Sequence, residues 1–326
     1  MVVGNNNLKN KMEKSDYILV TGGNGFIGSH IVDYLITEGY KNVLSIDNLS
    51  GSNYGKMINI NPKCEYIFGD ISVAGVLDAI FKKHPVKYIF HIAANGNVPY
   101  SNEFPLVDFN SNALGTFNVY NASLKNNVEK VIFASTAAVY GVPKNVPVSE
   151  TEPLNPISNY GLTKLYGEKL AIAYYHTYGL KTNVIRIFNT YGPRQPRYVL
   201  FDFINKLSKS KLNLEVLGND EQVRDYAYIS DTVEAFYNVM LSSNHGEVYN
   251  ISGGNPINLK YLISSISDIL EINPQITYTG KSWPGDLQVL HANISKIKND
   301  IGFAPKVSIA EGLKISVNWF KENNYI

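Results

Sequence analysis

Short apolar runs alternate with helix-like stretches along the first 190 residues of the chain. Residues 17–20, 42–47, 66–70, 88–91 and 130–135 are rich in apolar side chains, as is typical of strands buried on both faces. Between these runs, residues 26–35, 76–81 and 112–124 carry apolar side chains at helical spacing. Strands that alternate with helices predict a parallel sheet with right-handed crossovers and helices on both faces.

The pattern changes after residue 140, where prolines interrupt it before a long helix that we expect to end near residue 178. A strand at 183–188 and a segment rich in glycine and proline at 191–197 follow. We predict a Rossmann-type, doubly wound α/β domain at residues 16–189 and mainly a smaller C-terminal α/β substrate lobe at 190–326. The strand-like run 247–252 indicates that residues 225–252 rejoin the main sheet.

The composition excludes several classes of protein. The 326 residues carry a formal net charge of +1, which gives no electrostatic basis for binding nucleic acid or an anionic membrane. No run of about 20 apolar residues predicts a membrane span, and residues 1–15 read as a flexible extension without the apolar core of a secretory signal. The single cysteine, Cys64, cannot form an internal disulfide, and no cluster with metal-ligand spacing is present. We therefore expect a cytoplasmic protein without a metal.

A glycine-rich turn, Thr21-Gly22-Gly23-Asn24-Gly25-Phe26-Ile27-Gly28, follows the first predicted strand. In this spacing Gly22 permits a tight turn, Gly25 lets the backbone approach a pyrophosphate, and Gly28 allows close helix packing. The N-terminus of the following helix would present unpaired N–H groups to the phosphates. Such a turn can be purely structural, but its position between a strand and a helix favours dinucleotide binding.

Asp47 ends the second predicted strand, roughly 20 residues beyond the turn, where a carboxylate can bind a ribose 2′-hydroxyl. A carboxylate also repels a 2′-phosphate, and no arginine follows it directly, so we expect NAD rather than NADP. Asp47 could instead cap a turn. Asp70, at the end of the third strand, is a candidate contact for the adenine, with a plain turn role as the alternative.

Tyr160 and Lys164 are four residues apart, which puts both on one face of the long helix, with Ser158 as its N-cap. A free tyrosine has a pKa near ~10 and is a poor base at neutral pH. We expect the Lys164 ammonium, aided by an oxidised nicotinamide, to lower the pKa of Tyr160 and make it a general base on an alcohol. Thr136 would share a hydrogen bond with the same hydroxyl. A Tyr-Lys pair alone often lies on a solvated face, but together with the nucleotide turn it indicates redox chemistry at a carbinol carbon.

With these residues the chain resembles the extended short-chain dehydrogenase/reductases, and in particular the nucleotide-sugar epimerases and dehydratases. The similarity runs from about Tyr17 to the C-terminus. Its further markers are Asp47-Asn48-Leu49, His91-Ile92-Ala93-Ala94, Asn112-Ala113-Leu114-Gly115-Thr116, Val139-Tyr140-Gly141, Arg186-Ile187-Phe188-Asn189, Arg224-Asp225-Tyr226 and Pro284-Gly285-Asp286.

The resemblance implies NAD as the coenzyme, a nucleotide-linked sugar as the substrate, with UDP as the expected nucleotide, and a homodimer formed through the helix at 112–124 and the Tyr160 helix. It implies further coenzyme contacts from Phe26, Ile27, Asn48, Ile71, Ala93 and Asn112. It implies substrate contacts from Thr136, Asn189, Arg224, Asp286 and Leu290.

The residues after Thr136 bear on which reaction of the family is expected. The 4-epimerases oxidise C4 of the hexose, let the 4-keto sugar turn over and return the hydride to its other face. The 4,6-dehydratases and decarboxylases begin in the same way but use acidic residues after the catalytic threonine, where this chain has Ala137 and Ala138. Alanine cannot transfer a proton, so we favour epimerisation. A dehydratase, a decarboxylase, a reductase and a non-catalytic NAD- or sugar-nucleotide-binding regulator stay open as alternatives.

Three positions depart from the pattern of the family or leave the substrate open. Asn95-Gly96-Asn97 stands where some 4-epimerases have a lysine, and Trp283 stands where many relatives have an arginine for the diphosphate. Arg194 or Arg197 could replace that charge. Leu290 occupies the position that resembles the gate for N-acetylhexosamines, and leucine either admits an N-acetyl group or only packs against the lobe. Glucose, N-acetylhexosamine and hexuronate substrates all stay open.

Overall fold

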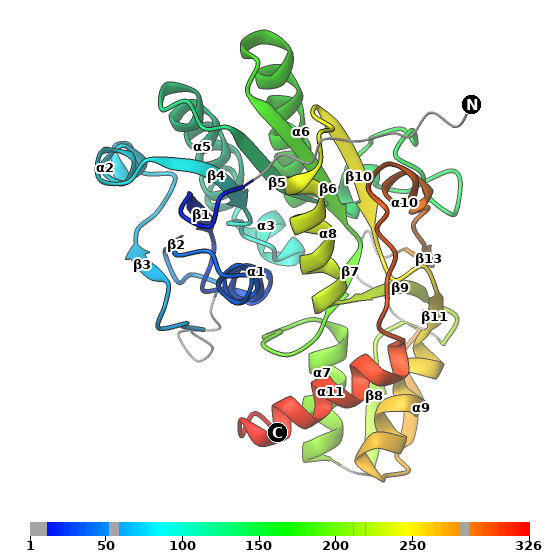
Figure 1. The fold of residues 1–326 in the computed structure, drawn as a ribbon. Helices are drawn as coiled ribbons and strands as arrows, with labels where there is room; N and C mark the ends of the chain where they lie inside the picture. Colours follow the sequence, from blue (N-terminus) through cyan, green and yellow to red (C-terminus); the bar gives the residue numbers. More distant parts are fainter. Residues whose placement is uncertain (1–11, 52–58, 211, 219, 281–286) are drawn as a thin grey trace, which may run out of the picture.

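The computed structural model describes residues 12–51, 59–210, 212–218, 220–280 and 287–326, and a seven-stranded sheet lies at its centre (Figure 1). The strand order is β10-β6-β5-β4-β1-β2-β3, and every neighbouring pair is parallel. This is the order of a doubly wound dinucleotide-binding sheet, and the predicted fold class is confirmed. The strands are β1 (Tyr17–Thr21), β2 (Asn42–Asp47), β3 (Glu65–Phe68), β4 (Val86–His91), β5 (Lys130–Thr136), β6 (Lys181–Ile187) and β10 (Glu247–Ile251).

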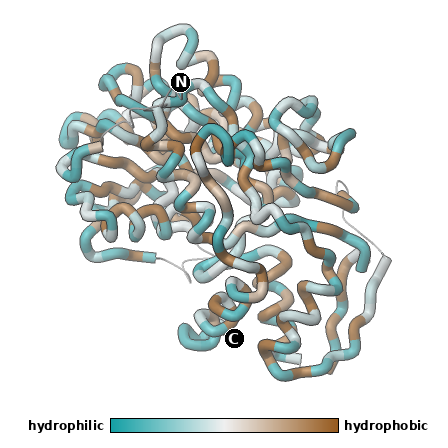
Figure 2. The backbone as a smooth tube through the Cα atoms, turned by 45° about the vertical axis from the view of Figure 1, so that its right-hand side comes forward, coloured by the Kyte–Doolittle hydropathy of each residue, from teal (hydrophilic) through white to brown (hydrophobic). Residues whose placement is uncertain are grey.

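Alternate side chains of these strands enter two separate apolar cores, one on each face of the sheet. Ile18 and Val20 pack with buried residues of α1 (Phe26–Thr37) and α8 (Ile229–Leu241). Leu19, between them, belongs to the opposite core with residues of α2 (Val76–Lys83), α5 (Gly115–Lys125) and α6 (Asn159–Tyr178). Figure 2 shows hydrophobic segments running through the interior and hydrophilic segments at many outer turns. Burial on both faces explains why the strands read as continuous apolar runs.

The helical segment expected at 112–124 begins differently from the prediction. After α3 (Val98–Glu103) the chain forms α4 (Pro105–Asp108), a π-helical segment η1 (Phe109–Leu114) and then α5. Asn112 therefore lies in a π-helix rather than at the start of an α-helix. A single wide turn of this kind redirects side chains, and it is common at functional sites.

The C-terminal half adds two small sheets beside the main one. One has the order β11-β9-β13 with β7 also paired to β9, and the other pairs β12 with β8. The elements are β7 (Asn189–Tyr191), α7 (Val199–Lys209), β8 (Asn213–Val216), β9 (Val223–Tyr228), β11 (Pro256–Asn258), α9 (Leu259–Leu270), β12 (Gln275–Tyr278), β13 (Val289–Leu290), α10 (Ser295–Ile301) and α11 (Ile309–Glu322). Helices α7, α9 and α11 lie together at the lower end of Figure 1, and the division into domains stays a prediction.

The described part of the presumed extension packs against the sheet. Met12 is buried in the apolar core, and the Lys41 N–H donates to the Lys14 carbonyl over 2.9 Å. The flexible extension expected at 1–15 is therefore wrong for residues 12–15, and residues 1–11 lie outside the described residues. None of the helices in the described part of the chain has the length and hydropathy that crossing a bilayer requires.

Candidate active site

A cavity of about 210 Å³ opens at the carboxyl ends of β1 and β4, where the strand order reverses. Most of the predicted coenzyme residues and the Tyr-Lys pair line it: Gly22, Gly25, Phe26, Ile27, Gly28, Asp47, Asn48, Asp70, Ile71, Ala93, Tyr160 and Lys164. Among the described residues, the lining does not include Asn112, Thr136, Asn189, Arg224 or Leu290. The structure thus brings the nucleotide turn and the Tyr-Lys pair to one cavity.

The glycine-rich turn has the geometry that its spacing predicts. Gly22 has a φ of 72°, and a Cβ added to it would lie 2.9 Å from the Ala93 Cα. A Cβ on Gly28 would lie 2.1 Å from the Gly22 carbonyl oxygen, so only glycine lets α1 approach the turn. Gly25 is the N-cap of α1 and offers no side-chain cap, which leaves the first N–H groups of the helix directed to the cavity. This cradle fits the pyrophosphate of a dinucleotide.

Asp47 makes the turn-capping contacts and also lines the cavity. Its carboxylate accepts the N–H of Leu49 over 2.7 Å and the N–H of Asn24 over 3.0 Å. Burial raises the pKa of Asp47, while these backbone hydrogen bonds act in the opposite direction. Both interpretations of this residue thus persist, and its contact with a ribose stays a prediction. An acidic group at this place suits NAD better than NADP.

Asp70 accepts three hydrogen bonds from its own surroundings. The donors are the Asn48 amide (2.9 Å) and the N–H and hydroxyl of Ser72 (2.8 and 2.7 Å). Burial raises the pKa of Asp70, but the hydrogen bonds from Ser72 and Asn48 outweigh it and lower the pKa overall. Asp70 is therefore a fixed carboxylate at the edge of the cavity, and its proposed contact with adenine is untested.

Helix α6 carries the Tyr-Lys pair as the sequence predicts. The Ser158 hydroxyl accepts the Gly161 N–H over 3.0 Å and caps the helix, as expected. Lys164 is 2% exposed, and its Nζ lies 4.4 Å from the centroid of the Phe133 ring. The ammonium is thus held in an apolar setting beside the cavity.

Burial dominates the electrostatics of both residues of the pair. Burial lowers the pKa of Lys164 to about 7, against the opposing charges of Asp108 and Glu168. Burial also raises the pKa of Tyr160, aided by Tyr198, whereas a hydrogen bond with Thr136 and the Arg197 guanidinium lower it. The lowering of the Tyr160 pKa expected from Lys164 together with an oxidised nicotinamide stays a prediction, and it has to overcome desolvation, which disfavours the phenolate and the ammonium alike.

Thr136 lies at the end of β5 and interacts with the phenol of Tyr160. Its hydroxyl oxygen also accepts the Ala138 N–H over 3.2 Å and caps a 3-10 turn, Ala137–Tyr140. The three residues of the predicted catalytic group are therefore adjacent. The next two positions after Thr136 present only methyl groups.

A buried ion pair behind the site was not anticipated from the sequence. Arg186 donates to both carboxylate oxygens of Glu168 over 2.9 and 2.7 Å, and the Ser135 hydroxyl donates to the same carboxylate. Arg186 also donates to the Tyr140 hydroxyl over 2.8 Å. Because these residues come from β5, β6, α6 and the 3-10 turn, the network joins the elements that hold Thr136, Tyr160 and Lys164.

Asn112, a predicted coenzyme residue, is 1% exposed and lies behind the cavity wall. Its side-chain oxygen accepts the Asn95 N–H over 2.7 Å, and its amide donates to Asp108 and Thr163 over 3.0 and 3.3 Å. Asn112 therefore supports the site through its neighbours, and its role toward a coenzyme stays a prediction.

Three predicted substrate residues lie on neighbouring strands of the small sheet. Asn189 is on β7, opposite Tyr226 of β9, and Leu290 of β13 is opposite Arg224 of β9. The Arg224 guanidinium donates to the carbonyl of its neighbour Val223 over 2.9 Å. Leu290 packs on an apolar cluster that includes Ala137 and Phe188, and both roles that the sequence left open for it stay predictions. Asp286 and Trp283 lie outside the described residues.

The segment 192–198 contains Arg194 and Arg197, the two candidates for the positive charge at the diphosphate. The structure gives them different contacts. Arg194 forms an ion pair with Asp33 of α1 (2.6 Å) and donates to Ser29 (3.2 Å). Arg197 lines the cavity together with Pro196 and Tyr198. Arg194 is thus occupied in fixing the segment to α1, and Arg197 is the arginine that meets the cavity.

Tyr198 lies at the other end of this segment, and no feature of the sequence singled it out. Its hydroxyl donates to the carbonyl of Gly96, and both residues line the cavity. Tyr198 adopts a φ of 79°, which is uncommon for a residue with a side chain and can be found only in the folded structure.

The comparisons with known proteins agree with this geometry. The family model described as GDP-mannose 4,6 dehydratase matches residues 19–316. The chain belongs to this family. The relationship to nucleotide-sugar epimerases and dehydratases stated from the sequence is confirmed.

Three known proteins, two of them with solved structures, are similar to almost the whole chain. A UDP-glucose 4-epimerase of Thermotoga maritima, solved with UDP-glucose, is 36% identical with a TM-score of 0.89 and covers 94% of this chain and 99% of its own. A UDP-glucose 4-epimerase of Thermus thermophilus in complex with NAD is 31% identical with a TM-score of 0.84, with the same coverage. A UDP-glucuronate 4-epimerase of Thermodesulfobacterium geofontis is 33% identical over 94% of this chain and 97% of its own.

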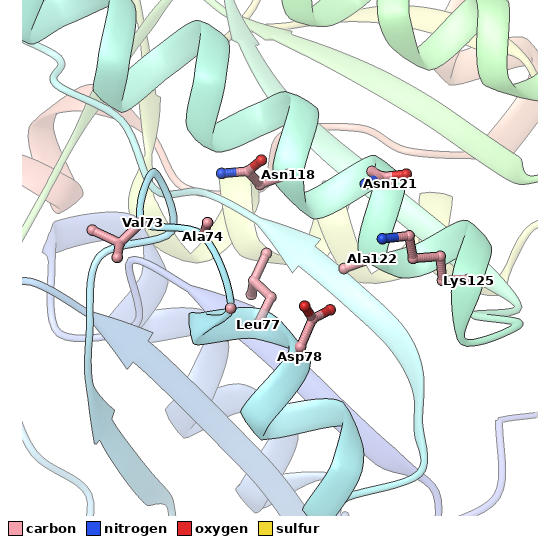
Figure 3. Close-up of a pocket in the computed structure, with 9 residues that line it drawn as sticks. Val73, Ala74, Leu77, Asp78, Asn118, Asn121, Ala122 and Lys125 are labelled. Atoms are coloured by element: carbon pink, nitrogen blue, oxygen red, sulfur yellow. The ribbon is translucent and has the colours of Figure 1, made fainter.

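This member of the GDP-mannose 4,6 dehydratase family has a second, smaller cavity of about 150 Å³ between α2 and α5 (Figure 3). Asp78, Asn118 and Lys125 are among its lining residues, and no predicted site residue is. Within the described residues, no group of three or more His, Cys, Asp or Glu side chains is placed to hold a metal ion.

Proposed function

We propose that this protein is an NAD-dependent nucleotide-sugar 4-epimerase that acts on a UDP-linked sugar. The observation that carries the proposal is that Tyr160 and Lys164 line the same cavity as the glycine-rich turn, with Thr136 hydrogen-bonded to Tyr160. A proton acceptor for an alcohol thus lies beside a cradle for a dinucleotide. The similarity to UDP-sugar 4-epimerases supports the same reaction.

Different residues of the chain would bind the coenzyme and transfer the proton. The N–H groups of the glycine-rich turn and the Asp47 carboxylate would hold NAD, which when bound supplies the hydride acceptor. Tyr160 would take the proton from the C4 hydroxyl of the sugar and return it to the C4 oxygen when the hydride comes back. Thr136 would hold that oxygen. Because burial raises the pKa of Tyr160, positive charge from Arg197 and Lys164 is needed to make the phenolate accessible.

Epimerisation is favoured over loss of water by the two alanines after Thr136. Ala137 is 5% exposed and packs in an apolar cluster, so no proton donor or acceptor stands there for elimination across C5 and C6. Arg224 and Arg197 are the candidate partners for the substrate diphosphate, since guanidinium groups bind phosphate in two-pronged fashion. Glucose, N-acetylhexosamine and hexuronate are the candidate sugars.

We further propose that the protein acts as a homodimer in the cytoplasm. Exposed apolar side chains on the α4 to α6 region support the dimer: Leu106, Phe109, Phe117, Leu162 and Tyr166. The only cysteine, Cys64, is buried and free, which suits a reducing compartment.

The test is incubation of the purified protein, without added coenzyme, with UDP-glucose, UDP-N-acetylglucosamine and UDP-glucuronate, with products resolved by NMR. A sugar inverted at C4 is the expected product, and a 4-keto-6-deoxy sugar would instead identify a dehydratase. Tyr160→Phe should lower turnover by about 10³-fold or more and leave bound NAD unchanged, since it removes only the phenolic hydroxyl that accepts and returns the proton. Turnover of none of the three sugars would favour a non-catalytic regulator.

A further inference from the structure

Asp108, which the sequence did not single out, lies fully buried beside the catalytic helix. It ends α4, and its carboxylate is 0% exposed. It accepts hydrogen bonds from the amides of Asn95 and Asn112, both over 3.0 Å, and from the Thr163 hydroxyl over 2.7 Å. Thr163 is the residue next to Lys164. Asp108 is thus joined to the catalytic helix at the residue next to Lys164 in the chain.

The three partners of Asp108 are all neutral. Amides and a hydroxyl satisfy the lone pairs of a carboxylate but do not cancel its charge. In the described part of the chain Asp108 forms no ion pair, and the charge that acts on it is that of Lys164. Burial raises the pKa of Asp108, whereas its hydrogen bonds from Thr163 and Asn95 and the charge of Lys164 lower it, so the carboxylate and the ammonium stabilise each other's charged form.

The other charged and titratable groups around Lys164 offer no equivalent counter-charge. Glu168 also acts on the pKa of Lys164, but less than Asp108 does, and its carboxylate is held in a two-pronged pair with Arg186. His91, on β4, holds both ring nitrogens in hydrogen bonds to Thr21 and Thr116, and burial lowers its pKa to about 3, so it is neutral.

On the cavity side stand Arg197, Tyr198 and Tyr160. Arg197 is itself cationic, and the two phenols are neutral unless they lose their protons. Among the described residues, Asp108 is therefore the carboxylate near Lys164 that no ion pair holds.

We propose that Asp108 is the counter-charge that keeps the buried Lys164 ammonium protonated and aligned for catalysis. It acts through Lys164 and is a positioning residue, so the kinetic part of the proposal rests on the proposed function. Without the carboxylate, burial in the apolar setting beside Phe133 would drive the lysine to its neutral form at the pH at which the enzyme works.

The test replaces the charge while keeping the shape, with Asp108→Asn. Lys164 loses its proton as pH rises through its pKa, so loss of an adjacent carboxylate should move the alkaline limb of kcat to lower pH by about one to two units. Above that limb, kcat should fall about tenfold for each unit of displacement, with KM changed little. Asp108→Glu, which restores the charge, should restore the limb.

The matched control is Asp231→Asn, which removes another buried carboxylate, on α8, that accepts the Val307 N–H over 3.1 Å. Asp231→Asn should lower the free energy of unfolding and leave the alkaline limb of kcat at the same pH. If Asp108→Asn lowers kcat but leaves the alkaline limb of the pH profile at the same pH, Asp108 is only a structural hydrogen-bond acceptor. That result would overturn the proposal.

A second measurement needs neither turnover nor a variant that folds. In the ¹³C-labelled native protein with its own coenzyme content, the Lys164 Cε and Asp108 Cγ signals should shift with the same midpoint as pH rises, because each charge senses the other. An Asp108 signal that stays constant through the Lys164 titration would refute the coupling. This result stands even if the protein proves not to be an epimerase.

Discussion

Gly28 shows how one absent side chain sets the distance between a helix and the nucleotide turn. A Cβ here would lie 2.1 Å from the Gly22 carbonyl oxygen, which is backbone and cannot swing aside. We expect Gly28→Ala to lower the free energy of unfolding by about 2 kcal/mol or more, because α1 must move away from the turn. It should also empty the protein of NAD. Urea unfolding and chromatography of the nucleotide released on denaturation measure the two effects.

The control for Gly28 is at the other end of the same helix. Gly39 has a φ of 88° and nothing within 4 Å of an added Cβ, and asparagine tolerates that backbone conformation. Gly39→Asn should cost less than 1 kcal/mol or so and leave the NAD content intact. Equal losses of NAD in both variants would mean that the turn does not form the coenzyme site.

Residues that act through local spacing could be predicted from the sequence, and those that act across the fold could not. The glycine spacing and the four-residue step from Tyr160 to Lys164 are local, and the structure brings them to one cavity. The partners of Asp108 come from positions 95, 112 and 163, so nothing in the local pattern marks it. The rise in the Tyr160 pKa caused by burial could not be predicted for a similar reason, since burial is a property of the folded site.

At the scale of elements, the residues that cap a helix could be predicted from the sequence, whereas the π-helical segment could not. Ser158 begins α6, and Gly179 ends it with a φ of 73°. In the π-helical segment η1, Asn112 forms hydrogen bonds with Asn95 and Thr163 of other segments. A periodicity of apolar residues contains no information on such contacts, so the sequence predicted an ordinary helix there.

Helices α4 to α6 also lead to a prediction about association. Leu106, Phe109 and Leu162 are 69%, 52% and 57% exposed, and α4 and η1 pack against α6. Apolar surface of this extent on adjoining helices is typical of an interface between copies. Light scattering at micromolar concentration should give twice the chain mass of 36.3 kDa, and Leu162→Glu should give a single chain mass.

Phe68, at the end of β3, supplies the control for that surface, because it is 76% exposed and lies on the edge strand of the main sheet. Phe68→Glu should leave the mass unchanged. A monomeric native protein at this concentration would remove the proposed dimer.

At the scale of the whole molecule, the parallel sheet order was predictable because alternating strands and helices allow few connections. The contacts that join the N-terminal and C-terminal halves of the chain could not be predicted. The segment from Pro193 to Tyr198 is fixed at one end to α1, where His30 donates to the Pro193 carbonyl over 3.0 Å, and at the other end to Gly96. These contacts join positions more than 100 residues apart and depend on the folded arrangement.

Three histidines make the stability of the whole molecule sensitive to acid. Burial, with Arg194 beside it, lowers the pKa of His30 to about 4, and burial, with Lys164 beside it, lowers that of His91 to about 3. Burial and the charges of two lysines likewise lower the pKa of His245 to about 4. Below pH ~6.5 the unfolded chain binds protons that the folded protein refuses, so the free energy of unfolding falls as pH falls. The three residues together should remove about 4 kcal/mol per pH unit between pH ~6.5 and ~4.

Urea unfolding at several pH values gives this slope. His30→Gln, which can still donate to Pro193, should lower the slope by about a third. His176→Gln, at an exposed position of α6, should leave it unchanged. A slope unchanged by His30→Gln would show that another group senses the acid.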